Sequence, residues 1–122
     1  MSKVLVVDDD VMSCELLDKF FTMKGDDLHM AYEDIQASEI AMSVKPDIIL
    51  LGITMLGENG LAVLKRFRES EHKVAILVLS EVKNVEIARN ALKMGADDYL
   101  TKPVNFAILE QKIASFLIER GK

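Results

Sequence analysis

The chain has 122 residues, of which 50% are hydrophobic and 29% are charged, and this composition predicts one globular domain with a buried core over residues 1–122. The net charge of −5 and the pI near 5.0 disfavour direct binding to nucleic acid or to an anionic membrane, because such partners would be repelled. The acidic start does not resemble a signal peptide and no apolar stretch is long enough to span a bilayer, so we expect a cytoplasmic protein. The single cysteine, Cys14, excludes an internal disulfide and fits a reducing compartment.

Short β-rich runs alternate with segments of helical period along the whole chain. The predicted strands are 3–7, 28–31, 47–51, 74–79 and 98–101. The apolar stripes between and after them are Met12, Leu16, Leu17, Phe20 and Phe21; Ala37, Ile40, Ala41 and Val44; Leu61, Leu64 and Phe67; Val85, Ala88, Ala91 and Leu92; and Phe106, Leu109, Ile113, Phe116 and Leu117. Pro46 and Gly95 are expected to end two helices, and Asn105 to cap the last. This alternation predicts an α/β fold, with a doubly wound five-stranded parallel sheet between two layers of helices.

Polar side chains follow three of the predicted strands. Asp8, Asp9 and Asp10 come after the first strand, Ser80 after the fourth, and Lys102 after the fifth. Ligands in doubly wound sheets bind at the carboxyl ends of the strands, so these residues are expected to meet at one edge. A site that combines carboxylates able to hold Mg²⁺ with a hydroxyl and an ammonium suits a phosphoryl group. Lys102 precedes Pro103, and a cis bond there would aim the lysine into the crevice.

Four segments carry a resemblance to a known family. They are 4-VLVVDDD-10, 46-PDIILLGITMLGENG-60, 76-ILVLSE-81 and 95-GADDYLTKPV-104, and together they resemble the receiver domain of bacterial response regulators, in order and over essentially the whole chain. The resemblance implies a flavodoxin-like fold and a role in two-component phosphorelay signalling rather than enzymatic activity. It also implies that Asp8 and Asp9 hold Mg²⁺, that Ser80 and Lys102 contact the phosphoryl group, and that Tyr99 is a switch aromatic coupled to Ser80.

The sequence departs from the family at the residue that matters most for phosphorylation. In receivers the third strand ends in an aspartate that accepts the phosphoryl group, and here Gly52 stands at that position. Leu56 replaces the usual proline, and Glu81 stands where a small residue is common. Glycine has no nucleophilic oxygen, so no catalytic residue is assigned, and Thr54 is only a weak substitute.

Loss of the acceptor carboxylate has two expected consequences for the rest of the pocket. The Mg²⁺ site would keep Asp8, Asp9 and the carbonyl of Thr54, so we expect metal binding to be weak or absent. Lys102 would lose a partner and is expected to turn towards Asp9.

These residues predict an atypical receiver that acts as a phosphorylation-independent interaction module. Alternatives are a substituted form of a normal receiver and, in another class, a nucleotide- or flavin-binding protein on the same scaffold, although no glycine-rich phosphate loop follows the first strand. Expected partners are a histidine kinase or a downstream signalling protein. By the resemblance, contacts between copies or with a target would use the fourth helix, fifth strand and fifth helix, with Arg89, Lys93, Asp97, Asp98 and Glu110.

Overall fold

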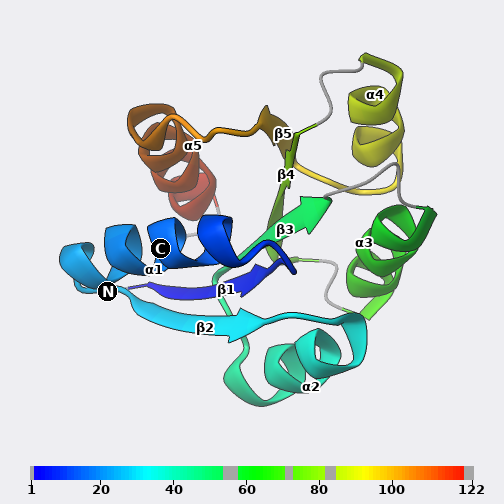
Figure 1. The fold of residues 1–122 in the computed structure, drawn as a ribbon. Coiled ribbons are helices and arrows are strands. Elements are labelled where there is room, and N and C mark those ends of the chain that lie inside the picture. The colour runs from blue at the N-terminus through cyan, green and yellow to red at the C-terminus, as the bar shows by residue number, and fades with distance from the viewer. Residues whose placement is uncertain (1, 54–57, 71–72, 82–84, 120–122) are drawn as a thin grey trace.

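The structure is a computed structural model that describes residues 2–53, 58–70, 73–81 and 85–119. Five strands alternate with five helices (Figure 1), as the sequence predicts. The strands are β1 (Lys3–Val7), β2 (Asp27–Ala31), β3 (Ile48–Ile53), β4 (Ala75–Ser80) and β5 (Asp98–Thr101). The helices are α1 (Val11–Lys24), α2 (Asp34–Val44), α3 (Glu58–Ser70), α4 (Val85–Lys93) and α5 (Phe106–Glu119).

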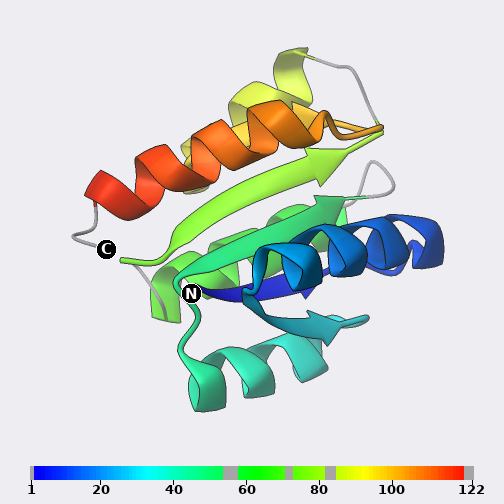
Figure 2. The same cartoon turned by 90° about the vertical axis from the view of Figure 1, so that its left-hand side faces the viewer.

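The strands form one parallel sheet in the order β2-β1-β3-β4-β5. The order reverses after β1, which is the topology of a doubly wound fold. The strand arrows visible in Figure 2 point the same way, and the parallel pairing places the carboxyl ends of all five strands along one edge. The predicted fold class is confirmed, and this edge is where the polar residues of the strand ends gather.

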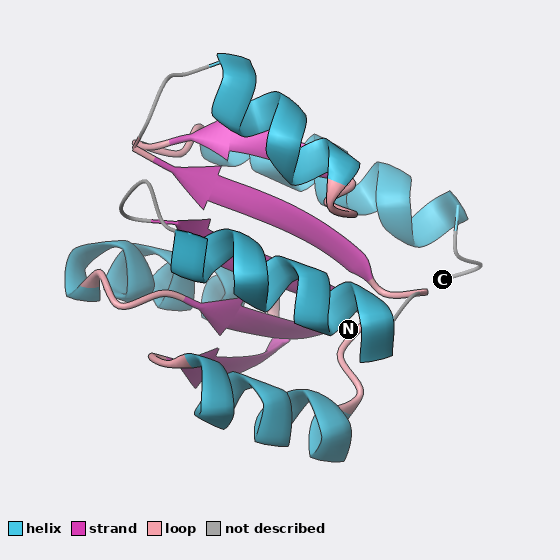
Figure 3. Ribbon diagram, turned by 90° about the vertical axis from the view of Figure 1, so that its right-hand side faces the viewer, coloured by secondary structure: helices cyan, strands magenta, loops and turns pink. Residues whose placement is uncertain are grey.

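Helices cover both faces of the sheet. Helices α1 and α5 lie on the face seen in Figure 2, whereas α2, α3 and α4 lie on the opposite face, seen in Figure 3. Each face has its own apolar core because successive residues of a strand point to opposite sides. Val4, Val6, Ile48 and Leu50 pack towards α1 and α5, and their neighbours in the sequence pack towards α2 to α4. Strands buried on both faces explain the uninterrupted apolar runs of β3 and β4.

Helix α1 presents a different face to the core from the predicted one. Cys14, Leu17 and Phe21 are buried, while Met12 and Leu16 of the predicted stripe are mostly exposed. Residues spaced by three and four share a helix face, and several apolar residues of α1 compete for that role. The stripe was therefore wrong at Met12 and Leu16, although it correctly included Leu17 and Phe21.

The predicted ends of the later elements hold. Asn105 accepts a hydrogen bond from the N–H of Ile108 at 3.1 Å and caps α5. Gly95 follows α4 with a φ of 118°, a conformation that favours glycine. Lys102-Pro103 is a cis peptide bond. Within the described residues, no helix is both long and apolar enough to cross a membrane.

Candidate functional site at the carboxyl edge of the sheet

The pairing of β1 with β3 brings Asp8 to Gly52. Val7 and Leu51 are partners in the parallel ladder, so the residues that follow them, Asp8 just beyond the end of β1 and Gly52 near the end of β3, lie side by side. A Cβ atom built on Gly52 would lie 2.2 Å from both Cγ and Oδ2 of Asp8. The Asp8 carboxylate thus lies in the space that any side chain at position 52 would need.

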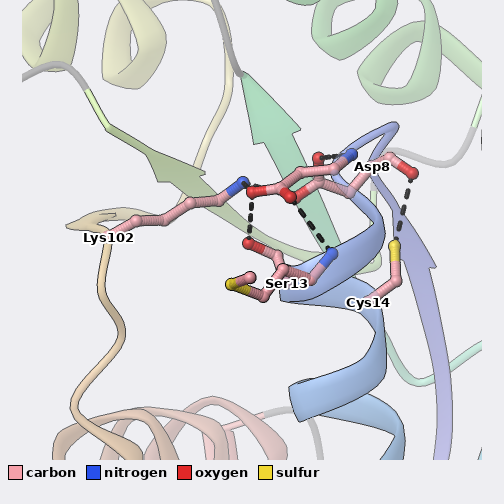
Figure 4. Close-up of polar contacts among 6 residues, drawn as sticks. Asp8, Ser13, Cys14 and Lys102 are labelled. Carbon is pink, nitrogen blue, oxygen red and sulfur yellow. Dashed lines mark hydrogen bonds and ion pairs between the residues drawn. The ribbon is translucent and has the colours of Figure 1, made fainter.

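Asp8 forms a buried ion pair with Lys102, which reaches it from the end of β5 (Figure 4). The Nζ of Lys102 lies 2.6 Å from Oδ2 of Asp8, and the two side chains are 6% and 1% exposed. The other carboxylate oxygen, Oδ1, accepts the N–H of Asp10 at 3.0 Å. The expectation that Lys102 turns towards Asp9 was wrong, because Asp8 points inward and Asp9 is exposed.

Asp10 has a structural role at the start of α1. Its carboxylate accepts the N–H of Met12 at 3.2 Å and the hydroxyl of Ser13 at 2.8 Å, and so caps the helix. Lys102 lies 3.7 Å away. The Ser13 hydrogen bond, aided by the positive charge of Lys102, holds the pKa of Asp10 below its ordinary value, with partial desolvation acting in the opposite direction. Of the three acidic residues after β1, one is paired, one is exposed and one caps the helix.

Ser80 and Tyr99 lie on strands next to each other. Ser80 is the last residue of β4, fully buried and paired with Thr101 of β5 in the ladder. Tyr99 is partly buried and packs against the core on the side of α2, α3 and α4. The Lys102 N–H donates to the Ser80 carbonyl at 2.7 Å, so the hydroxyl-bearing and lysine-bearing segments are tied together at this edge.

Two residues singled out by sequence, Thr54 and Leu56, lie outside the described residues. In the part of the chain that is described, no three histidine, cysteine, aspartate or glutamate side chains gather as metal ligands do. Asp8 and Asp9 both lie at the expected edge, but Asp8 is buried and Asp9 is exposed.

A groove of about 450 Å³ opens beside the ion pair, between α1 and the start of α5. Its walls are mostly apolar, with Leu16, Val104 and Phe106 among them, and Asp10 and Lys102 line its polar end. Glu81 is exposed and is also among the residues that line this groove.

Cys14 is a neighbour of the site that sequence reasoning did not connect with it. Its thiol donates to the Asp8 carbonyl at 3.4 Å, visible in Figure 4. Burial, reinforced by the nearby negative charge of Asp8, raises the pKa of the Cys14 thiol to about 11. The six-residue separation of Asp8 and Cys14 across a helix start was the available signal, since it places the first buried turn of α1 against the end of β1.

The surface formed by α4, β5 and α5 differs in part from the expected set of charges. Arg89, Lys93 and Glu110 are exposed. Asp97 instead accepts hydrogen bonds from Arg68 of α3 and from the N–H of Ile76, and Asp98 pairs with Lys112. The carboxylates of Asp97 and Asp98 therefore make contacts with other residues of this chain.

Comparison with known proteins points to one family. Residues 4–114 match the response regulator receiver domain. The chain is 31% identical over 119 residues to the probable transcriptional regulatory protein SilR of Salmonella typhimurium, and 34% identical over 119 residues to the transcriptional regulatory protein PrrA of Mycobacterium leprae. These matches cover 98% of the chain but 52% and 51% of the two relatives, so the chain spans about half their length. The crystal structure of a two-component response regulator from Clostridium difficile, 31% identical, superimposes with a TM-score of 0.91 over 100% of both chains.

Proposed function

The chain belongs to the response regulator receiver domain family, and on that premise we propose that it is a receiver that works without phosphorylation at the usual position. Receiver domains are signalling modules that interact with histidine kinases and other proteins. This one would serve as a protein-interaction module of a two-component pathway, and its interaction surface would keep one conformation that phosphorylation does not switch.

The observation that carries the proposal is the absence of a nucleophile at the end of β3. Phosphoryl transfer to a receiver needs a carboxylate oxygen that can attack phosphorus, and Gly52 has none. The neighbouring carboxylate of Asp8 is a poor replacement, because Lys102 and the N–H of Asp10 already bind its two oxygens and its side chain is 1% exposed.

The same geometry supports weak or absent Mg²⁺ binding. Mg²⁺ requires oxygen ligands in a near-octahedral arrangement and usually takes one or two carboxylates. Asp8 is turned towards Lys102, and Asp9 is exposed beside it. These residues do not fit a Mg²⁺ site in this arrangement, so no step of the proposed function passes through the metal.

Incubation with acetyl phosphate and Mg²⁺, followed by intact-protein mass spectrometry, tests the proposal. We expect no phosphoryl adduct, whereas a typical receiver treated in parallel should acquire one. A stoichiometric acyl phosphate on the wild-type chain would show that the proposal is wrong. If the chain is instead a substituted form of a normal receiver, Gly52→Asp alone should restore labelling to the level of the typical receiver.

The interaction surface that we propose lies on α4, β5 and α5. Its exposed residues combine the charges of Arg89 and Lys93 with the apolar side chains of Leu92 and Ile108. Light scattering over a range of protein concentrations would test self-association, and Leu92→Glu should weaken any dimer formed there. A dimer that withstands this change would place the contact elsewhere.

A further inference from the structure

Glycine at position 52 is not explained by its own backbone. Gly52 lies within β3, paired with Leu79 of β4, and its φ is outside the left-handed range that favours glycine. Glycine in the interior of a strand lowers stability, because it loses more conformational entropy and packs no side chain. A strand glycine commonly marks a close approach by another group. Here that group is the Asp8 carboxylate.

Asp8 could not adopt its observed position beside a larger residue. An added Cβ would lie 2.2 Å from Cγ and Oδ2 of Asp8 and 2.8 Å from Oδ1, all closer than side-chain carbons approach other atoms. Asp8 has only two side-chain torsions with which to move away. Movement of the carboxylate away from position 52 would disturb the contacts that it makes with Lys102 and with the N–H of Asp10.

The Asp8–Lys102 pair neutralises the edge of the sheet from within the protein. The lysine ammonium supplies the positive charge that a divalent cation would otherwise bring to the carboxylate. Both side chains are almost completely buried, so the pair also fills the volume next to Gly52. With the Asp8 carboxylate turned inward, the next residue, Asp9, is the acidic side chain after β1 that is exposed to solvent.

We propose that the Asp8 carboxylate is an internal plug, which Gly52 admits and Lys102 holds, and that this plug closes the pocket to cations and to phosphodonors. Gly52 and Asp8 are then a coupled pair, and glycine has a positive role beyond the loss of an acceptor. This inference deepens the proposed function and depends on it only for the biological meaning of the closed pocket. One consequence is that Gly52→Asp by itself introduces a carboxylate into space that is already filled.

The test adds a single methyl group, Gly52→Ala, in three backgrounds: the wild type, Asp8→Asn and Asp8→Ala. Asparagine keeps the size of the plug without its charge, whereas alanine removes it. We expect Gly52→Ala to lower the urea midpoint in the first two backgrounds. In the Asp8→Ala background it should raise the midpoint, because alanine is better than glycine in a strand once the space is free.

A rise in midpoint in the wild-type background, or an equal fall in all three, would overturn the proposal. A second readout covers the case in which Asp8→Ala does not fold. In Gly52→Ala the displaced Asp8 would turn towards Asp9 and solvent, so Mg²⁺ should raise the melting temperature by about 5 °C at ten times its dissociation constant. The wild type should show no such rise at equal ionic strength, and its absence from Gly52→Ala would count against the plug.

Neither readout uses a phosphodonor, so the two hypotheses fail separately. A phosphoryl adduct on the wild-type protein overturns the proposed function and the closure to phosphodonors, whereas the comparison of the three backgrounds still decides whether Asp8 fills the space beside Gly52. If alanine is tolerated at position 52 without displacement of Asp8, the plug hypothesis is wrong. The proposed function is unaffected by that result, because the protein still lacks an acceptor carboxylate.

Discussion

Replacing Lys102 with methionine should be among the most destabilising single changes at the site. The substitution keeps an unbranched side chain but removes the ammonium that lies 2.6 Å from Asp8 Oδ2. A carboxylate whose side chain is 1% exposed is then left without its cation. Breaking a buried pair from one side typically costs about 3–5 kcal/mol, because the remaining charge is uncompensated.

That cost is large beside the stability of a domain of this size. Total unfolding free energies are about 5–15 kcal/mol, so the variant is expected to lose a fifth or more of its stability. An unfolding entropy of about 2.1 cal/mol/K per residue, applied to 122 residues, converts each kcal/mol to about 4 °C of melting temperature. We therefore expect melting to fall by roughly 12–20 °C.

Urea unfolding of a double-mutant cycle measures the pair itself. Asp8→Asn keeps the shape and an oxygen that can accept the N–H of Asp10, and combining it with Lys102→Met leaves no buried charge from the pair. The double variant should be more stable than the sum of the two losses predicts, with a coupling of about 1–3 kcal/mol. Unchanged m-values would show that the unfolded state is comparable between variants.

The control is the pair between Lys24 and Asp26, whose N–O distance is 3.5 Å and whose lysine and aspartate side chains are 30% and 11% exposed. Lys24→Met should cost less than about 1 kcal/mol, because this contact is longer and solvent screens the lysine. Additive losses for Asp8 and Lys102, or a Lys102→Met cost no larger than that of the control, would refute the description of a buried, coupled pair.

Other residues around the site and core give further tests by urea unfolding. Asp10→Ala should cost about 0.5–2 kcal/mol at neutral pH through loss of the helix cap. The depressed pKa of Asp10 means that its own contribution is present above the unfolded value of 3.8 and disappears as pH falls through the lower folded value, so the mutant and wild type should converge in acid. For Cys14 the sign is opposite: a folded pKa of about 11 against 9.0 means that stability present below pH 9 is lost as pH rises through 11, by up to roughly 3 kcal/mol, and Cys14→Ala should lack this loss. Phe21→Ala should cost about 3–5 kcal/mol because Phe21 is fully buried, and a loss below 1 kcal/mol would contradict its place in the core. Arg68→Met should cost about 2–3 kcal/mol, because its guanidinium binds the Gly95 and Val74 carbonyls and Asp97, and a neutral effect would show that these contacts add nothing.

The sequence by itself determined the fold class and the edge at which the site lies. Apolar runs such as residues 48–51, separated by segments of helical period, leave a parallel sheet covered on both faces as the consistent solution. Because parallel strands end at one edge, the positions of Asp8, Ser80 and Lys102 after or at strand ends were enough to bring them there. Local signals such as the Asn105 cap were also readable, since they involve only neighbouring residues.

The tertiary structure decided which of these groups touch. Asp8 and Asp9 are adjacent in sequence, but successive residues leaving a strand point in different directions, and only the packed structure shows that Asp8 turns inward to Lys102. The exposure of Met12 and Leu16 was also decided by the tertiary structure, because packing determines which side of α1 faces the sheet. Above all, the sequence gives Gly52 only as a missing side chain. The pairing register of β1 and β3 places Asp8 in the space that a side chain at position 52 would occupy. This register brings together residues that lie more than forty positions apart in the chain.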